Sequence, residues 1–257
     1  MPVVINLTMS IFLLVLGLVI GSFLNVCIYR IPKNISVAKG RSMCPSCASA
    51  IHGYDNIPVL SYLILRGKCR NCGARISPRY PIVELLCGVC FVLVWLRYGF
   101  SWLTPIYCAY AAVLITLAFI DLDTQEIPDR FHIIILGLGV AAVFAVPEPT
   151  IVQRLIGAAC ISVPMFVLAL LTGGFGMGDI KLMAASGFLL GWKANVFAAL
   201  LGCIIAAVVA GILVALKKKT RKDHIAFGPY LAIGLFVAAL YADQIINAYI
   251  GLFTFAL

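Results

Sequence analysis

Two short acidic stretches interrupt an otherwise apolar chain, and their carboxylates are the side chains best suited to chemistry. Residues 119–130 read FIDLDTQEIPDR, and residues 172–181 read TGGFGMGDIK. When two carboxylates share a site, their repulsion keeps one protonated while the other is ionised. The ionised group can activate water, and the protonated group can polarise a carbonyl. The two stretches therefore suggest a pair of catalytic aspartates that hydrolyse a peptide bond.

The first acidic stretch offers more than one candidate. Asp121 and Asp123 extend from the end of an apolar run, whereas Asp129 follows Pro128 at a position typical of a helix start. The D-x-D pair would also suit a divalent cation, as in enzymes that hold metal-bound phosphates, but no phosphate-cradling motif accompanies it. This stretch thus offers two candidates for the catalytic acid, Asp121 and Asp123.

The second stretch presents one acid, Asp179, in a glycine-rich setting. Gly176 and Gly178 let the backbone adopt unusual dihedral angles and let another chain approach closely, which suits a loop that seats a carboxylate beside a bound peptide. The alternative is a flexible connector between two helices. We count Gly176, Gly178 and Lys181 among the supporting residues of the site.

Four cysteines form two C-x-x-C pairs. Cys44 and Cys47 make the first pair, and Cys69 and Cys72 make the second. This spacing is typical of a structural zinc ion bound by four thiolates, which would fold a segment too short to bury a core. The alternatives are two disulfides or free thiols, and a reducing cytoplasmic location makes disulfides unfavourable.

Composition decides the fold class that must position these residues. Hydrophobic residues make up 63% of the 257, charged residues only 11%, and the mean hydropathy is +1.09. These values exclude a soluble globular protein and predict an all-α polytopic membrane protein with about eight transmembrane helices. Apolar runs of suitable length occupy residues 7–29, 81–98, 103–121, 130–147, 151–171, 195–216 and 229–250, with a shorter run at 182–192. The first run has no cleavage pattern after it, so we expect a retained helix.

Positive charge sets the expected orientation. Of the 19 lysines and arginines, 16 fall in the loops 30–80, 121–130, 172–181 and 217–228. This bias predicts that the four loops are cytoplasmic and that the N-terminus lies outside. The formal net charge of +9 does not indicate a nucleic-acid partner, because the basic residues alternate between loops and form no single face.

Three parts of the chain follow from these patterns. Residues 1–29 form the first transmembrane helix, residues 30–80 form a small zinc-stapled cytoplasmic domain, and residues 81–257 form the membrane-embedded core that carries both acidic stretches. Glu84 lies near the start of the second apolar run. It is either a cap-like charge favoured by the helix dipole or a polar contact into the bundle or a substrate site.

Several motifs taken together resemble the bacterial type IV prepilin peptidases. They are GSFLNV at 21–26 with YRIP at 29–32, the paired C-x-x-C segment, DNIP at 55–58, RYP at 79–81 with Glu84, the stretch from Asp121 to Asp129, and G-x-G-D at 176–179. The resemblance runs in order over nearly the whole chain. These enzymes are leader peptidases and N-methyltransferases of the bacterial inner membrane.

The resemblance implies a specific chemistry. Asp121 and Asp179 would be the catalytic pair of a GxGD-type aspartic protease, with Asp123 as the nearby competitor of Asp121 for that role. Such an enzyme removes a short basic leader from prepilins or pseudopilins at the cytoplasmic membrane face. The enzyme would then methylate the new N-terminus with S-adenosylmethionine. No G-x-G-x-x-G motif shows where the methyl donor binds, so Glu84 and the 30–80 domain are our candidates for that site.

Two other classes of function compete with this interpretation. A transporter would place acids near mid-membrane within inverted repeats, but the acids lie at helix ends and no repeat is evident. A zinc-stapled scaffold without catalysis would tolerate Asp179→Asn. The serine-hydrolase motif G-x-S-x-G and the metalloprotease motif H-E-x-x-H are both absent. The sequence does not identify the pilin substrates, so a role in type IV pilus assembly and a role in type II secretion both stay open. It also does not determine the oligomeric state.

Overall fold

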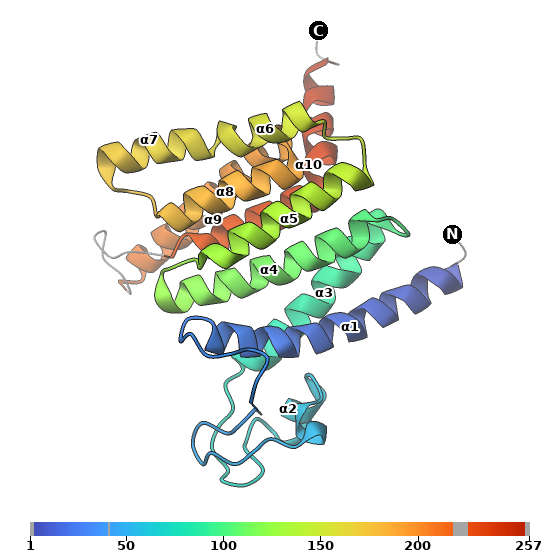
Figure 1. Cartoon of the computed structure of the whole chain (residues 1–257), viewed down its shortest axis with the longest axis vertical. Coiled ribbons are helices and arrows are strands. Elements are labelled where there is room, and N and C mark those ends of the chain that lie inside the picture. The colour runs from blue at the N-terminus through green and yellow to red at the C-terminus, as the bar shows by residue number, and fades with distance from the viewer. Residues whose placement is uncertain (1–2, 41, 218–225, 255–257) are drawn as a thin grey trace. The chain divides into compact units, whose positions relative to one another are not determined.

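A computed structural model describes residues 3–40, 42–217 and 226–254 of the chain (Figure 1). In this described part, regular structure is helical apart from two isolated β-bridges. The chain divides into two compact units, Met1–Thr104 and Pro105–Leu257. Some of the basic residues used to predict orientation lie outside the described residues, namely Arg41, Lys218, Lys219, Arg221 and Lys222.

The first unit is a helix pair that carries a small extramembrane segment. Helices α1 (Val3–Arg30) and α3 (Arg79–Tyr98) pack along each other, and between them lie a short 3-10 helix η1 (Gly53–Asn56) and helix α2 (Leu60–Ile64). A Cβ atom added at Gly21 would lie 2.6 Å from Glu84 Cα, and one at Gly17 would lie 2.7 Å from Gly88 Cα. The two backbones thus approach at a spacing that only glycine permits, as small residues allow in membrane helix pairs.

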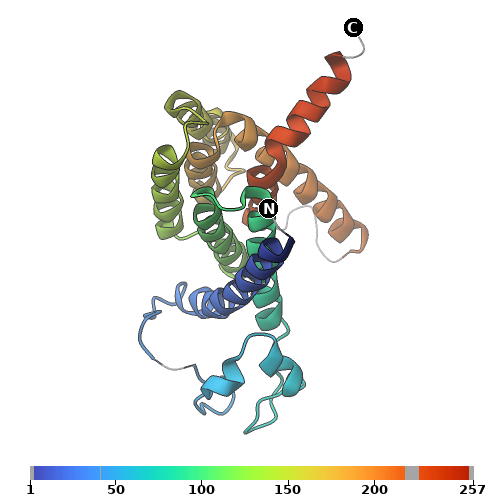
Figure 2. The ribbon, with the colours of Figure 1, turned by 90° about the vertical axis from the view of Figure 1, so that its right-hand side faces the viewer.

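The second unit is built around helix α8 (Met177–Leu190). Besides α8 it contains α4 (Leu103–Thr124, from its third residue), α5 (Asp129–Ala145), α6 (Ile151–Cys160), α7 (Ser162–Thr172), α9 (Trp192–Ala215) and α10 (Gly228–Thr254). Helix α8 contacts α5, α6, α7, α9 and α10, and eight of its 14 residues are buried. In Figure 1, α6 and α7 lie along one side of α8 and α5 lies along the other. The C-terminal part of α10 projects beyond the other helices of this unit (Figure 2).

A buried arginine fixes the far end of α8. Arg154 of α6 is 1% exposed, and its guanidinium donates to the carbonyls of Leu189 at 2.7 Å and Pro149 at 3.0 Å. The last carbonyls of a helix lack partners within it, and a cation is favoured at that end. With its C-terminus held in this way, α8 can present its first turn in a defined place.

The helices confirm a multi-pass membrane protein with about eight membrane segments. Six are long and apolar enough to span a bilayer: α1, α3, α4, α6–α7 taken together, α9 and α10. The two other expected segments form α5 and α8, with 17 and 14 residues. The run 151–171 spans α6 and α7, which are separated only at Ile161. One predicted boundary was wrong: α8 begins at Met177, so Asp179 belongs to a helix and not to a connecting loop.

Candidate active site

Asp121 lies in the last turn of α4, where its carboxylate is held by the start of another helix. Its side chain is buried, at 5% exposure, and Oδ2 accepts a 2.9 Å hydrogen bond from the backbone N–H of Gly228, the first residue of α10. The first N–H groups of a helix have no partner within it and carry its positive end. A Cβ atom at residue 228 would lie 2.8 Å from this Oδ2, so the contact requires glycine.

The other acids of the first stretch have a different setting. Asp123 and Glu126 are exposed, whereas Asp121 is buried. The geometry favours Asp121 over Asp123 as the acid of a desolvated pair, and its catalytic role stays a prediction.

Asp179 lies in the first turn of α8, and Gly176 occupies the N-cap position before it. Its Oδ1 atom is buried and has no hydrogen-bond partner among the described residues. Burial raises the pKa of Asp179, and the nearby negative charge of Asp121 raises it further, to about 7. Asp179 precedes the apolar run 182–192 of the expected eighth segment and lies outside the six spans named above. The two acids thus interact electrostatically, which is the arrangement expected of a pair that shares one proton.

Apolar contacts bring three segments of the chain together around these acids. A Cβ atom at Gly178 would lie 3.0 Å from Cβ of Ile127, and one at Gly228 would lie 3.2 Å from Cδ1 of the same isoleucine. The rings of Phe175 and Phe227 are 6.0 Å apart between centroids. The sequence analysis missed the third segment, the start of α10. The Phe-Gly-Pro run at 227–229, directly before an apolar stretch, is the helix-start signal that could have revealed it.

Lys181 connects the starts of two helices. Its Nζ donates to Oδ1 of Asp129 at 2.7 Å, so the first turn of α8 is joined to the first turn of α5. The lysine also lowers the pKa of Asp129. His132 lies buried one turn along α5, with Nδ1 3.5 Å from the same Oδ1. Asp129 therefore begins its helix, as its position after Pro128 indicated, and also forms an ion pair with Lys181.

The four predicted zinc ligands of the first unit do come together. The sulfur atoms of Cys44, Cys47, Cys69 and Cys72 all lie within 4.8 Å of one another, and those of Cys44 and Cys72 are 3.8 Å apart. Four sulfurs arranged tetrahedrally at the usual Zn–S bond length are also about 3.8 Å apart. All four are free thiols, which does not favour the disulfide alternative.

The two cysteine pairs share one turn geometry. The carbonyl of Cys44 accepts from Ala48 N–H at 2.9 Å, and that of Cys69 accepts from Gly73 N–H at 3.0 Å. Ala48 and Gly73 both have positive φ, at 55° and 71°. The repeated turn directs each pair of thiols toward the other, so the residues present fit a tetrahedral metal ion such as zinc.

Glu84 makes a polar contact within the first unit and does not cap its own helix. It lies in the second turn of α3 at 8% exposure, and Oε2 accepts from the backbone N–H of Val59 at 2.8 Å. The Ser22 hydroxyl of α1 also hydrogen-bonds to it. Asn25 makes a parallel link, because its Nδ2 donates to the carbonyl of Tyr80 at 3.1 Å. Of the two alternatives, the structure thus shows the polar contact.

Known proteins match the chain over both units. Residues 15–98 match the Bacterial Peptidase A24 N-terminal domain, and residues 108–211 match the Type IV leader peptidase family. A prepilin leader peptidase/N-methyltransferase of Stutzerimonas stutzeri is 35% identical over 92% of both chains. The chain belongs to the prepilin leader peptidase/N-methyltransferase family. A protein of the same printed name from Neisseria gonorrhoeae is 36% identical over 91% of both chains. Another from Bacillus subtilis is 36% identical over 93% of this chain and 96% of its own. No solved structure matches the chain.

Membership in the prepilin leader peptidase/N-methyltransferase family confirms the resemblance drawn from the motifs. Each family region lies within one of the two structural units, so the thiol cluster and Glu84 belong to the A24 N-terminal domain, and both aspartates belong to the leader peptidase region. The leader peptidase match ends at residue 211, before Gly228. The helix start that holds Asp121 is therefore visible only in the fold.

Proposed function

We propose that this protein is an aspartic endopeptidase that removes the basic leader from type IV prepilins or pseudopilins and then methylates the new N-terminus with S-adenosylmethionine. The printed names of its relatives support both activities. The observation that carries the peptidase half is the interaction of two acids, Asp121 and Asp179, where three segments of the second unit meet.

The surroundings of the two aspartates assign them different roles in this proposal. Asp179, with its raised pKa, holds the proton and polarises the scissile carbonyl. Asp121 faces a backbone N–H at the positive end of α10, which stabilises a negative carboxylate, so it is the base that activates water. No covalent intermediate is needed, and water supplies the oxygen of the new carboxyl group.

The metal that we propose for the first unit has a structural role. Cys44, Cys47, Cys69 and Cys72 would hold zinc as four thiolates, and this closed set leaves no coordination position for a substrate. When bound, the ion would supply folding free energy to a segment with little core of its own.

We further propose that the protein lies in the bacterial inner membrane with its N-terminus outside. The zinc domain and the ends of α4 and α8 that carry the acids would then be cytoplasmic, in line with the charge bias of the loops. A prepilin has an apolar stem and a basic leader, so it would reach the acids laterally from the bilayer. The bilayer and the prepilin or pseudopilin are thus its expected partners, with no nucleic acid.

The experiment that tests the peptidase assignment is cleavage of a prepilin-like substrate in detergent, followed by mass spectrometry of the new N-terminus. Asp121→Asn and Asp179→Asn should each lower the cleavage rate by about 10³-fold or more, because each removes one half of a cooperating pair. Wild-type product should carry one added methyl group.

Asp123→Asn is the matched control, because it makes the same change two residues after Asp121 on the same helix. It should keep cleavage within about threefold of wild type, since surface substitutions have small effects. Full activity in either of the first two variants would break the assignment of the pair, and loss of activity only in Asp123→Asn would transfer the role to that residue.

A further inference from the structure

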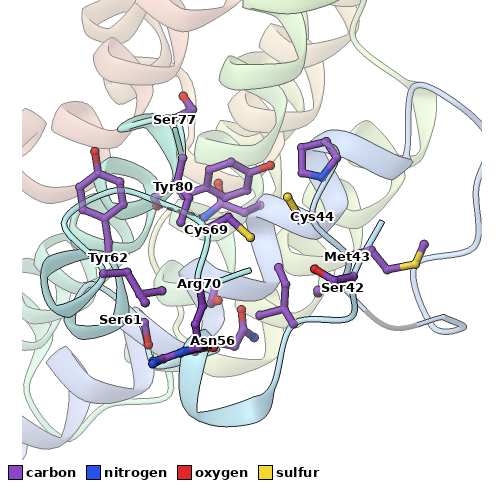
Figure 3. Close-up of a pocket in the computed structure, with 18 of the residues that line it drawn as sticks. Ser42, Met43, Cys44, Asn56, Ser61, Tyr62, Cys69, Arg70, Ser77 and Tyr80 are labelled. Atoms are coloured by element: carbon purple, nitrogen blue, oxygen red, sulfur yellow. Dashed lines mark hydrogen bonds and ion pairs between the residues drawn. The ribbon is translucent and has the colours of Figure 1, made fainter. Parts of the chain in front are cut away.

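His132 is a buried polar side chain to which the proposed peptidase chemistry gives no role. It lies one turn along α5 at 7% exposure, and neither ring nitrogen has a well-aligned hydrogen bond within the part of the chain that the structure describes. Buried polar atoms without partners are rare and unfavourable, so this ring needs an explanation. The cavity of about 630 Å³ shown in Figure 3 does not provide one, because residues 22–84 of the first unit line it.

The imidazole lies between the starts of two helices. Its Nδ1 is 3.5 Å from Oδ1 of Asp129, the first residue of α5, and the ring also interacts with the backbone of Gly178 in the first turn of α8. Gly178 directly precedes Asp179. An imidazole carries a hydrogen-bonding nitrogen on each of two sides, so one ring can bond to both neighbours. His132 is thus placed to join α5 to the turn of α8 that carries Asp179.

Two other contacts tie this turn of α8 to the start of α5. Lys181 donates to Asp129 at 2.7 Å, and a Cβ atom at Gly178 would lie 3.0 Å from Cβ of Ile127, just before α5. The two helices also pack along each other (Figure 1). The start of α5 is therefore the support on which the first turn of α8 rests, and an adjustment between the two helix starts moves Asp179.

We propose that His132 is a positioning residue of the peptidase site, which fixes Asp179 at its working distance from Asp121. With substrate bound, the ring bonds to Asp129 on one side and to the Gly178 backbone on the other. Hydrogen bonds of catalytic sites often tighten only in the complex, so substrate binding supplies the alignment that these two contacts lack. The inference rests on the proposed function, and it assigns no proton transfer to the ring itself.

The test is cleavage of a prepilin-like peptide by the full-length protein in detergent, with kcat and KM measured from pH 6 to pH 9. His132→Phe keeps a flat ring but removes both nitrogens. It should lower kcat about tenfold and change KM by less than about threefold, because a small misplacement of a reacting group acts mainly on the chemical step. Its melting temperature should equal or exceed that of wild type, because two unpaired buried polar atoms are removed.

The pH profile separates positioning from a general loss of activity. Burial and the charge of Asp121 raise the pKa of Asp179, while the other charged groups at this turn, Lys181 and Asp129, pair with each other. If the phenylalanine variant lets the two acids move apart, the repulsion between them weakens. The alkaline limb of kcat, which reports the substrate-bound enzyme, should then move to lower pH by about half a unit or more.

His132→Gln is the rescue variant, because its amide keeps a donor and an acceptor but does not titrate. It should recover most of kcat and the wild-type alkaline limb, which proton transfer by the ring itself would not allow. Ile133→Phe is the matched control, because it introduces the same ring at the next residue of α5, which is 70% exposed. This control should cleave within about twofold of wild type.

Asp129→Asn reaches the same link without touching the buried ring, at a side chain that is 69% exposed. It should lower kcat about threefold or more with KM nearly unchanged. If the ring acts through Asp129, combining this change with His132→Phe should cost less than the product of the two single losses, since coupled residues are not additive. Losses that multiply fully would show that the ring and the carboxylate act independently, which would overturn the proposal.

The outcomes separate this inference from the proposed function. Suppose that Asp121→Asn and Asp179→Asn abolish cleavage but His132→Phe keeps kcat within about twofold of wild type, or that His132→Gln fails to restore it. The positioning role is then wrong while the proposed function stands. A lower melting temperature with an unmoved alkaline limb would likewise show a purely structural role. If either aspartate variant keeps full activity, the pair itself fails and His132 has nothing to position.

Discussion

At the scale of single residues, the protonation of Asp179 should set the pH dependence of cleavage. Its pKa lies at about 7, so rising pH removes the proton through which it would polarise the scissile carbonyl. Both acids are then ionised and the proton donor is lost. We expect kcat/KM for a prepilin-like peptide to be about 100-fold lower at pH 9 than at pH 6, as for a single group that must be protonated.

The control for this profile is Glu126→Gln, which removes an exposed acid of the same stretch. Its alkaline limb should match that of wild type. A wild-type profile that stays level from pH 6 to pH 9 would show that Asp179 is not the proton donor.

At the scale of secondary-structure elements, the close contact of α1 and α3 should be sensitive to one methyl group. Gly21→Ala would place a Cβ atom 2.6 Å from Glu84 Cα, and backbone cannot move aside as a flexible side chain can. Overpacking of this kind costs about 1–3 kcal/mol. We expect a lower melting temperature in detergent.

Gly137→Ala is the matched substitution, because it lies inside α5 and an added Cβ atom there meets nothing within 4 Å. Alanine is favoured over glycine inside a helix by about 0.5–1 kcal/mol. This variant should therefore melt at the same temperature as wild type or slightly above it. Equal behaviour of the two variants would argue against glycine-dependent packing of α1 and α3.

At the scale of the whole molecule, the distribution of charge predicts the orientation in the membrane. Alkaline phosphatase fused after Glu148 should be active, because the loop after α5 is expected outside, where that enzyme matures. A fusion after Gly173 should be inactive, because this loop is expected in the cytoplasm. The reverse pattern, measured in cells with equal expression of both fusions, would invert the proposed topology and remove the acids from the cytoplasmic face.

Much of this arrangement could be predicted from the sequence, because its signals are local. An apolar run of spanning length predicts a membrane helix wherever it lies, and each C-x-x-C pair carries its turn within a few residues. The expected segments and the gathering of the four thiols were therefore correct in the structure. The motifs also determined the family, since they occur in order along the chain.

Only the tertiary structure decided which local candidates meet. Asp121 and Asp123 look equivalent in sequence, but in the fold Asp123 is exposed, whereas Asp121 is buried and accepts a hydrogen bond from Gly228, which is 107 residues away in the chain. In the same way, the alternatives for Glu84 were resolved by Val59, and Lys181 gained its partner in Asp129. Such contacts depend on how helices pack, and the packing is set by many small apolar contacts summed over the fold and not by any pattern near the residue itself.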